Sequence, residues 1–345
     1  MKEYRIGVMG ATGAVGREMI KILGERNFPV SELRCMASER SAGKTVDTPY
    51  GQVEIVKTDK SAFKDLDIVL GASENNIAKE MAPHIISSGA VFVDNSSAFR
   101  MYDEVPLIVP EINPEDIHRH KGVISNPNCS TIITLVAINA INKLSKIEAM
   151  YASTYQAVSG AGAAGPKEMY EQSEKILLGR KAGKSGVLYE ADIEPATFQY
   201  QIAYNLIPQI GDFDNNGYTA EEMKLQNEGR KILHLPELKV SCTCVRVPVE
   251  RSHAISVNII TEDILKESDI REAIAKAPGC KLYDDKDNNL YPMPLITSNQ
   301  DDVYVGRIRR DLVNDRGINL WCCGDQVRKG AATNAVQIAE LLIEK

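Results

Sequence analysis

Three features that mark nucleic-acid-binding, membrane or secreted proteins are missing from this sequence. Lysine and arginine total 40 against 47 aspartates and glutamates, so the formal net charge is -7 and no basic face for a nucleic acid is implied. No apolar run approaches the roughly 18 residues that are needed to cross a bilayer. The opening residues, MKEYRIGVMGATG, contain no signal-peptide pattern. We therefore expect a cytoplasmic protein that binds neither nucleic acid nor membrane.

Cysteine is present, but it lacks the spacing of a disulfide framework or of a zinc site. The seven cysteines are an odd number, and neither CxxC spacing nor a His–Cys cluster occurs among them. Cys242 and Cys244 lie two apart in a β-rich stretch, so we expect both to face one side of a strand as small apolar residues. The pattern predicts free thiols and no metal.

The first third of the chain alternates short apolar segments with amphipathic ones. The segments with the composition of buried strands are residues 3–9, 31–38, 67–73 and 90–97. Residues 14–24 and 75–87 have helical spacing between them. This alternation predicts an α/β fold with a parallel, doubly wound sheet.

From about residue 146 the pattern changes to alternating strands with few helices between them. The expected strands are residues 150–160, 239–249 and 254–261. They predict a mixed, largely antiparallel sheet with helices on one face, which is an α+β domain. Helical spacing precedes this region at residues 130–144 and returns at residues 330–345.

Gly10, Gly13 and Gly16 form a GxxGxxG motif between the first expected strand and the first expected helix. Glycines permit a tight turn and close backbone approach, and the N–H groups at a helix N-terminus bind a pyrophosphate. The motif therefore indicates a dinucleotide site, with a tight turn that binds no ligand as the alternative.

The end of the second expected strand bears on the choice between NAD and NADP. NAD enzymes usually place an acidic residue there for the ribose 2′-hydroxyl. Here Ser38 and Ser41 can donate to a 2′-phosphate while Arg40 supplies charge, which favours NADP. Glu39 would suit NAD if it pointed inward, but its place beyond Ser38 favours exposure to solvent.

One cysteine, Cys129, follows Asn126-Pro127-Asn128 at the start of the long apolar helix. The positive end of a helix dipole favours the thiolate form of a cysteine. The backbone N–H of Cys129 and the side chain of Asn128 could also form an oxyanion hole. Position alone fits a nucleophile and a buried thiol equally well.

His253 has the intrinsic chemistry of a general acid or base. Arg246 lies seven residues earlier, and Pro248 with the turn-like residues 250–252 favours a bend between them, so both could reach one site. A structural histidine is the alternative.

Together these features resemble the aspartate-semialdehyde dehydrogenase family, in its Gram-positive and archaeal-like branch. The matching stretches run in order from residue 5 to residue 340 and are GVMGATGAVG, ASERSAGK, VDNSSAFRM, SNPNCST, STYQAVSGAG, NLIPQIGDFDNNGYTAEEMK, CVRVPVERSH and RKGAATNAVQIAE. The resemblance implies a Rossmann-like NADP-binding domain of residues 1–127 with 326–345. It implies an α+β catalytic and dimerisation domain of residues 128–325 with a mixed sheet, in a homodimer or a dimer of dimers.

The resemblance also implies catalytic roles for four residues. Cys129 is the nucleophile and His253 the general acid/base. Gln156 positions the substrate near the thiol, and Asn128 belongs to the same cysteine motif.

Four further residues are implied in substrate binding. Arg246 holds the α-carboxylate with its planar guanidinium, and Glu221 binds the α-amino group. Lys224 and Arg100 bind the phosphate. Without the resemblance, Glu221 and Lys224 fit solvated helix charges, and Arg100 fits a loop charge.

The implied cofactor is NADP. Its expected contacts are Gly10, Thr12, Gly13, Ala14, Val15, Gly16, Ser38, Arg40, Ser41, Ser73, Ser159, Gly160 and Gln326. Gln326 departs from the family, which commonly has an asparagine whose amide meets the nicotinamide carboxamide. Glutamine keeps the amide chemistry but adds a methylene group.

The implied reaction is the NADPH-dependent reduction of L-aspartyl-4-phosphate to L-aspartate-4-semialdehyde and phosphate, on the route to lysine, threonine and methionine. N-acetyl-glutamyl-phosphate reductase is one rival, but it typically has glycine where this chain has Asn128. Its acetylated substrate also needs no acidic partner such as Glu221. The other rival is a non-catalytic NADP-binding paralogue, against which the full set of catalytic residues counts.

Overall fold

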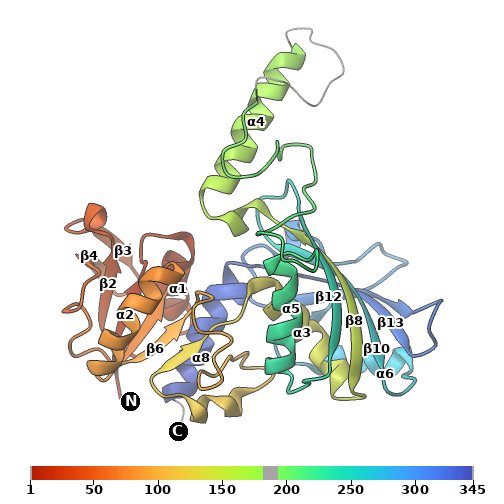
Figure 1. The fold of residues 1–345 in the computed structure, drawn as a ribbon, viewed down its shortest axis with the longest axis horizontal. Helices are drawn as coiled ribbons and strands as arrows, with labels where there is room; N and C mark the ends of the chain where they lie inside the picture. Colours follow the sequence, from red (N-terminus) through yellow and green to blue (C-terminus); the bar gives the residue numbers. More distant parts are fainter. Residues whose placement is uncertain (1, 182–192, 344–345) are drawn as a thin grey trace. The chain divides into compact units, whose positions relative to one another are not determined.

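The computed structural model describes residues 2–181 and 193–343, which pack as two units (Figure 1). The first unit consists of residues 2–139, 227–236 and 327–343. The second consists of the described residues of 140–226 together with 237–326.

The first unit contains a seven-stranded sheet in the order β3-β4-β2-β1-β5-β6-β7. Its strands are β1 (Tyr4–Met9), β2 (Val30–Ala37), β3 (Thr45–Thr48), β4 (Gly51–Lys57), β5 (Ile68–Gly71), β6 (Val91–Asp94) and β7 (Val123–Ser125). All neighbours pair in parallel except β3, which forms an antiparallel hairpin with β4 at one edge. The doubly wound parallel sheet that the sequence predicts is confirmed.

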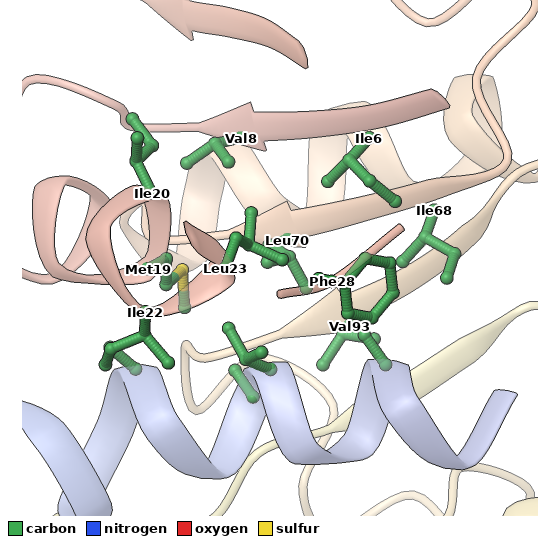
Figure 2. Close-up of a cluster of buried hydrophobic side chains, with 14 of the residues drawn as sticks. Ile6, Val8, Met19, Ile20, Ile22, Leu23, Phe28, Ile68, Leu70 and Val93 are labelled. Atoms are coloured by element: carbon green, nitrogen blue, oxygen red, sulfur yellow. The ribbon is translucent and has the colours of Figure 1, made fainter. Parts of the chain in front are cut away.

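Successive side chains of the central strand enter different cores, because alternate residues of a strand face opposite sides of the sheet. Ile6 and Val8 pack with α1 (Ala14–Glu25) and α8 (Thr333–Ile343) in one apolar cluster. Figure 2 shows this cluster between the strands and the two helices. Met9 packs on the other face with α2 (Asn75–Ser87). Helices on both faces explain why these strands are almost continuously apolar.

The second unit contains a six-stranded sheet in the order β11-β12-β13-β10-β8-β9. Its strands are β8 (Ile147–Gln156), β9 (Lys239–Arg246), β10 (His253–Thr261), β11 (Cys280–Leu282), β12 (Val303–Arg310) and β13 (Gly317–Gly324). The central pairs are antiparallel, and the pair at each edge is parallel. The mixed, largely antiparallel sheet is therefore confirmed.

Other elements lead into these sheets or follow them. They are the helices α3 (Cys129–Asn142), α4 (Ala164–Lys181), α5 (Ala220–Ile232), α6 (Glu267–Lys276) and α7 (Pro294–Thr297), the 3-10 segments Glu39–Ser41, Pro114–Arg119 and Val158–Ala161, and a π-helical turn at Arg328–Ala332. The sequence pattern does not predict the long α4; Figure 1 shows it extending away from the six-stranded sheet of its unit.

Three expected elements differ from the structure at their ends. The strand expected over residues 150–160 ends at Gln156, because the N–H and C=O groups of Ala157 bond to side chains instead of a neighbouring strand. The strand expected over 239–249 ends at Arg246. The final helix begins at Thr333, after the π-helical turn.

The seven cysteines are all free. Cys242 and Cys244 lie on β9 with their sulfur atoms 3.8 Å apart and both side chains buried, as the alternation predicts. The hydrogen bond with the Cys242 thiol, followed by burial, raises the pKa of Cys244 far above its ordinary value. Among the residues that the structure describes, no helix is long and apolar enough to cross a membrane.

The apolar cluster between α1 and the seven-stranded sheet predicts a large difference between two leucine truncations. Leu23 is fully buried there, whereas Leu312 is 100% exposed. Leu23→Ala should lower the free energy of unfolding by about 2–5 kcal/mol, since it leaves a cavity. Leu312→Ala should change it by less than about 0.5 kcal/mol. Urea denaturation of both variants measures the difference, and equal losses would contradict the assigned core.

Candidate active site

The turn after β1 is built so that only glycine fits at its two ends. Gly10 has φ of +84°, and a β-carbon there would lie 2.3 Å from the backbone oxygen of Ala72. A β-carbon on Gly16 would lie 2.3 Å from the backbone oxygen of Gly10. The N–H groups of Gly10 and Ala11 both donate to the oxygen of Met36 on the neighbouring strand. The turn is thus fixed tightly between β1, β2 and α1.

This turn lies where the chain order of the sheet reverses, because β1 is flanked by β2 on one side and β5 on the other. Dinucleotides bind at such positions. The helix α1 begins after Gly13 with no side-chain cap and no acidic residue in its first turn, so nothing competes there with a pyrophosphate. Ser73, two residues past β5, has a buried hydroxyl group with no hydrogen-bond partner among the described residues. These residues fit a dinucleotide.

Thr12, Ala14 and Val15 line the same turn, with Ala14 exposed and the other two partly buried.

The groups expected to select NADP follow β2. Ser38 and Arg40 are exposed, and Ser41 ends the short 3-10 segment. Glu39 is 80% exposed and its carboxylate bonds to Lys57 at 2.8 Å. The expected exposure of Glu39 is confirmed, and Ser38, Arg40 and Ser41 remain available for a 2′-phosphate.

Cys129 is the first residue of α3, and its surroundings differ from those of an ordinary core thiol. Between residues 123 and 141 every residue is buried except Cys129, which is partly exposed. The side-chain oxygen of Asn128 accepts from the N–H groups of Ser130 and Thr131 at 3.1 and 3.2 Å. Asn128 is therefore the N-cap of α3, a role that leaves the start of the helix well ordered.

Arg100 lies beside this turn and is buried. Its Nε donates to the oxygen of Asn126 at 2.9 Å, and its Nη2 donates to the oxygen of Asn95 at 2.9 Å. Its Nη1 donates to Glu228 on α5 at 3.0 Å. Sequence reasoning misses Glu228. It lies seven residues after Glu221 on the same helix, and that spacing is the one signal that would have found it.

In the second unit the backbone of Ala157, just past β8, bonds to two of the expected site residues. Its N–H donates to Nδ1 of His253 at 3.1 Å. Its carbonyl accepts from Nη1 of Arg246 at 2.7 Å. Arg246 ends β9 and His253 begins β10, so the bend expected between them is present.

His253 is fully buried, and burial followed by the charge of Arg246 lowers its pKa to about 3, against a smaller opposing effect of Glu221. The ring is therefore neutral at working pH. Because Nδ1 accepts from the N–H of Ala157, the ring proton lies on Nε2. His253 thus offers a hydrogen-bond donor and has no second lone pair for a base.

Gln156, Glu221 and Lys224 continue the cluster. Gln156 is buried; its side-chain nitrogen donates to Glu221 at 3.3 Å, and its oxygen accepts from Thr154 at 2.9 Å. Lys224 bonds to Glu221 at 2.8 Å. Amide, carboxylate and ammonium groups therefore lie side by side near Arg246, which pairs in register with Gln156. Such a set can bind a zwitterionic amino acid.

Three expected cofactor residues lie around the same loops. A β-carbon on Gly160 would lie 2.8 Å from Nη1 of Arg246 and 3.2 Å from Cε1 of His253, so glycine lets both side chains approach. The Gln326 oxygen accepts from the N–H of Ser252, and its nitrogen donates to the hydroxyl of Ser159. In this structure Gln326 fastens two loops together through both ends of its amide.

Each unit thus brings together one part of the expected set. The first holds Gly10, Thr12, Gly13, Ala14, Val15, Gly16, Ser38, Arg40, Ser41, Ser73, Arg100, Asn128 and Cys129. The second holds Gln156, Ser159, Gly160, Glu221, Lys224, Arg246, His253 and Gln326. In the described part of the chain, no group of three or more His, Cys, Asp or Glu side chains could hold a metal ion.

Gly10→Ala tests the dinucleotide turn. The positive φ costs an L-residue about 1–2 kcal/mol, and the clash with Ala72 adds to it. We expect the dissociation constant for NADP to rise at least about tenfold in isothermal titration calorimetry. Gly89→Ala is the matched control, since Gly89 has φ of +88° but a β-carbon there would meet no atom within 4 Å. Equal loss of NADP binding in both variants would reject the site.

The buried neutral imidazole predicts a pH dependence with a definite sign. The pKa of His253 is about 3 in the folded chain, below the ordinary unfolded value, so the folded state binds fewer protons. Its contribution to stability is full above pH ~6.5 and falls by up to about 1.4 kcal/mol per unit as pH drops toward 3.

The measurement is a histidine nitrogen–proton NMR titration, with the His253 signal assigned by its loss in His253→Gln. The signal should keep an Nε2–H pattern from pH 8 to pH 5. His234→Gln removes the signal of a histidine whose side chain is 58% exposed and serves as the assignment control. A midpoint for His253 above pH 5.5 would overturn the assignment.

Two family models match the chain. Residues 5–120 match the semialdehyde dehydrogenase NAD binding domain, and residues 138–329 match the semialdehyde dehydrogenase dimerisation domain.

Full-length relatives agree with these models. The chain is 48% identical to the aspartate-semialdehyde dehydrogenase of Synechocystis, over 99% of this chain and 98% of that protein. It is 44% identical to that of Bacillus subtilis, over 98% and 96%. The crystal structure of aspartate semialdehyde dehydrogenase II complexed with ASA from Vibrio cholerae has a TM-score of 0.92 at 41% identity and covers 99% of both chains. The resemblance inferred from the motifs is confirmed: the chain belongs to the aspartate-semialdehyde dehydrogenase family.

Proposed function

We propose that this chain reduces L-aspartyl-4-phosphate with NADPH, giving L-aspartate-4-semialdehyde and phosphate. The observation that carries the proposal is the isolation of Cys129 as the one partly exposed residue in a buried stretch, at the start of an apolar helix. A helix N-terminus favours the thiolate, which is the nucleophilic form of cysteine.

In the first step the Cys129 thiolate attacks the acyl carbon of the substrate. The bond to the phosphate oxygen breaks, and the phosphate leaves with the bonding pair, so a thioester remains on the sulfur. Arg100 and Lys224 are the cations that we propose bind the phosphate group. The guanidinium of Arg100 suits this task because it offers several donors in a fixed plane.

Recognition of the amino-acid portion falls to the groups around Ala157. Arg246 offers a guanidinium to the α-carboxylate, and Glu221 offers a carboxylate to the α-amino group. Gln156 pairs in register with Arg246, and its side-chain nitrogen donates to Glu221. Asn128 fixes the start of α3 as its N-cap, and the N–H of Cys129 is the proposed oxyanion donor.

The reduction step needs no base. The turn of Gly10 to Gly16 would hold NADPH, which would supply the hydride that reduces the thioester. The resulting alkoxide expels the Cys129 thiolate and becomes the aldehyde, so electrons and atoms balance without a proton taken from sulfur. The Nε2–H of His253 can stabilise the negative oxygen in both steps as a hydrogen-bond donor. We propose this donor role for His253 beside the general acid/base role that the resemblance implies.

The division of labour in the chain remains part of this proposal. Residues 1–127 with 326–345 would bind the dinucleotide, and residues 128–325 would carry catalysis and dimerisation. The match to a dimerisation domain supports a homodimer, or a dimer of dimers. Seven free cysteines suit the reducing cytoplasm.

The decisive assay follows the reverse reaction, the phosphate-dependent reduction of NADP by L-aspartate-4-semialdehyde. The kcat/KM for this substrate should exceed that for N-acetylglutamate semialdehyde by at least about a hundredfold, because the acetylated amine cannot pair with Glu221. NADP should be preferred to NAD. A preference for the acetylated substrate would assign the chain to the rival reductases. Binding of NADPH without any turnover would identify a non-catalytic paralogue.

Cys129→Ser tests the covalent step. Because a serine hydroxyl is a far weaker nucleophile than a thiolate, turnover should fall by about three orders of magnitude or more, with NADP binding unchanged. Cys280→Ser is the matched control, since Cys280 is also partly exposed and forms no disulfide. It should retain near-normal turnover. Substantial activity in Cys129→Ser would exclude the thioester route.

A further inference from the structure

Glu228 is a buried carboxylate whose two oxygens serve different parts of the first unit. Its side chain is 2% exposed. Oε1 accepts from Nη1 of Arg100 at 3.0 Å, and Oε2 accepts from the backbone N–H of Asn128 at 2.7 Å. A single side chain of α5 therefore joins the arginine proposed to bind phosphate with the residue that precedes the nucleophile.

A third hydrogen bond joins Arg100 directly to the same turn. Nε of Arg100 donates to the carbonyl of Asn126, two residues before Asn128. Arg100 and Glu228 thus hold the residue 126–128 turn at both ends, one through a carbonyl and the other through an N–H. Because Asn128 also caps α3, any movement of the turn would be passed on to Cys129.

Stability alone does not explain the buried ion pair between Arg100 and Glu228. Burying two charges carries a large desolvation penalty, and apolar residues of similar size often give equal or greater stability. The arrangement does define the direction of the guanidinium. Three of its five N–H groups are directed to Asn126, Glu228 and Asn95, so the remaining two have a fixed orientation.

We propose that Glu228 is a positioning residue, which holds the Arg100 guanidinium against the nucleophile turn and thereby sets the affinity for the phosphate group. This proposal rests on the proposed function, in which Arg100 binds that phosphate. Glu228 itself does not touch the substrate; it acts through Arg100 and the N–H of Asn128.

Glu228→Gln in the full-length chain is the test. The amide keeps the shape but replaces one of the two accepting oxygens with an NH2 donor, so the contact with either Arg100 or Asn128 is lost. In the reverse assay with inorganic phosphate, the KM for phosphate should rise at least about tenfold, whereas the KM for NADP should change less than about twofold. Inorganic phosphate should also lose its ability to slow alkylation of Cys129 by iodoacetamide. An unchanged KM for phosphate would overturn the proposal.

Asp284→Asn is the matched control. Asp284 is also a carboxylate whose side chain is only 6% exposed, and its Oδ2 accepts from Nη2 of Arg271 at 2.7 Å and from the backbone N–H of Ile308 at 3.1 Å. It lies in the second unit, outside the residues assigned to the site. A structural loss alone would affect both variants alike. A rise in the KM for phosphate that is confined to Glu228→Gln supports positioning, and the same rise in Asp284→Asn contradicts it.

Two further variants distinguish a role through Arg100 from a failure to fold and from a failure of the proposed function. If Glu228 acts through Arg100, adding Glu228→Gln to Arg100→Gln should raise the KM for phosphate by less than about twofold beyond Arg100→Gln alone. Full additivity would reject the coupling. Glu228→Asp, which keeps the charge and both acceptors, should restore part of the phosphate affinity and serves if Glu228→Gln does not fold. If wild type is inactive, or if Arg100→Gln binds phosphate normally, the proposed function has failed instead.

Discussion

Between the end of β7 and the start of α3, residues 126–128 carry backbone polar groups through a buried region. Water cannot satisfy such groups there, so protein atoms must do so. Arg100 and Glu228 bond to this turn from the outside, and Asn128 closes the first turn of α3 from within. The position of Cys129 follows from these bonds. The side-chain amide of Asn334 on α8 also donates to the side-chain oxygen of Asn126 in this turn. Helix α8 therefore helps to hold the proposed nucleophile.

Asn334 also belongs to a larger network of buried polar side chains that includes Lys329. Lys329 is 1% exposed, and its ammonium bonds to Glu111, Asn334 and Gln337 at 2.6–2.9 Å. Burial alone would raise the pKa of Glu111, but the charge and hydrogen bond of Lys329, together with a backbone hydrogen bond and that of Gln337, lower the pKa below its ordinary value. A lysine with three partners can be buried where an isolated one could not. The C-terminal motif RKGAATNAVQIAE therefore combines polar anchoring of the turn with the apolar face of α8 that packs on the sheet.

The sequence predicts local structure best where the spacing of apolar residues follows a single strand or helix period. Ile6 and Val8, with Met9 between them, have the texture of a strand covered on both faces, and the glycines at 10, 13 and 16 mark the turn. Strand ends are harder to predict. Nothing near Gln156 tells that the next peptide bonds to side chains of residues 246 and 253. Likewise Glu228 looks like any helix-surface glutamate, since its partners lie 100 and 128 residues away.

The contrast between motif and contact is clearest at His253. The family motif predicts that His253 is a general acid/base, and the imidazole side chain permits this role. Only the contact with the Ala157 N–H shows which nitrogen holds the proton, and only full burial shows why the ring stays neutral. A thiolate that attacks and later departs as a thiolate needs no proton on sulfur, so a fixed donor suffices. We propose that the buried turn holds the nucleophile in place and that the buried ring holds an oriented donor, which makes preorganisation the common principle of both units.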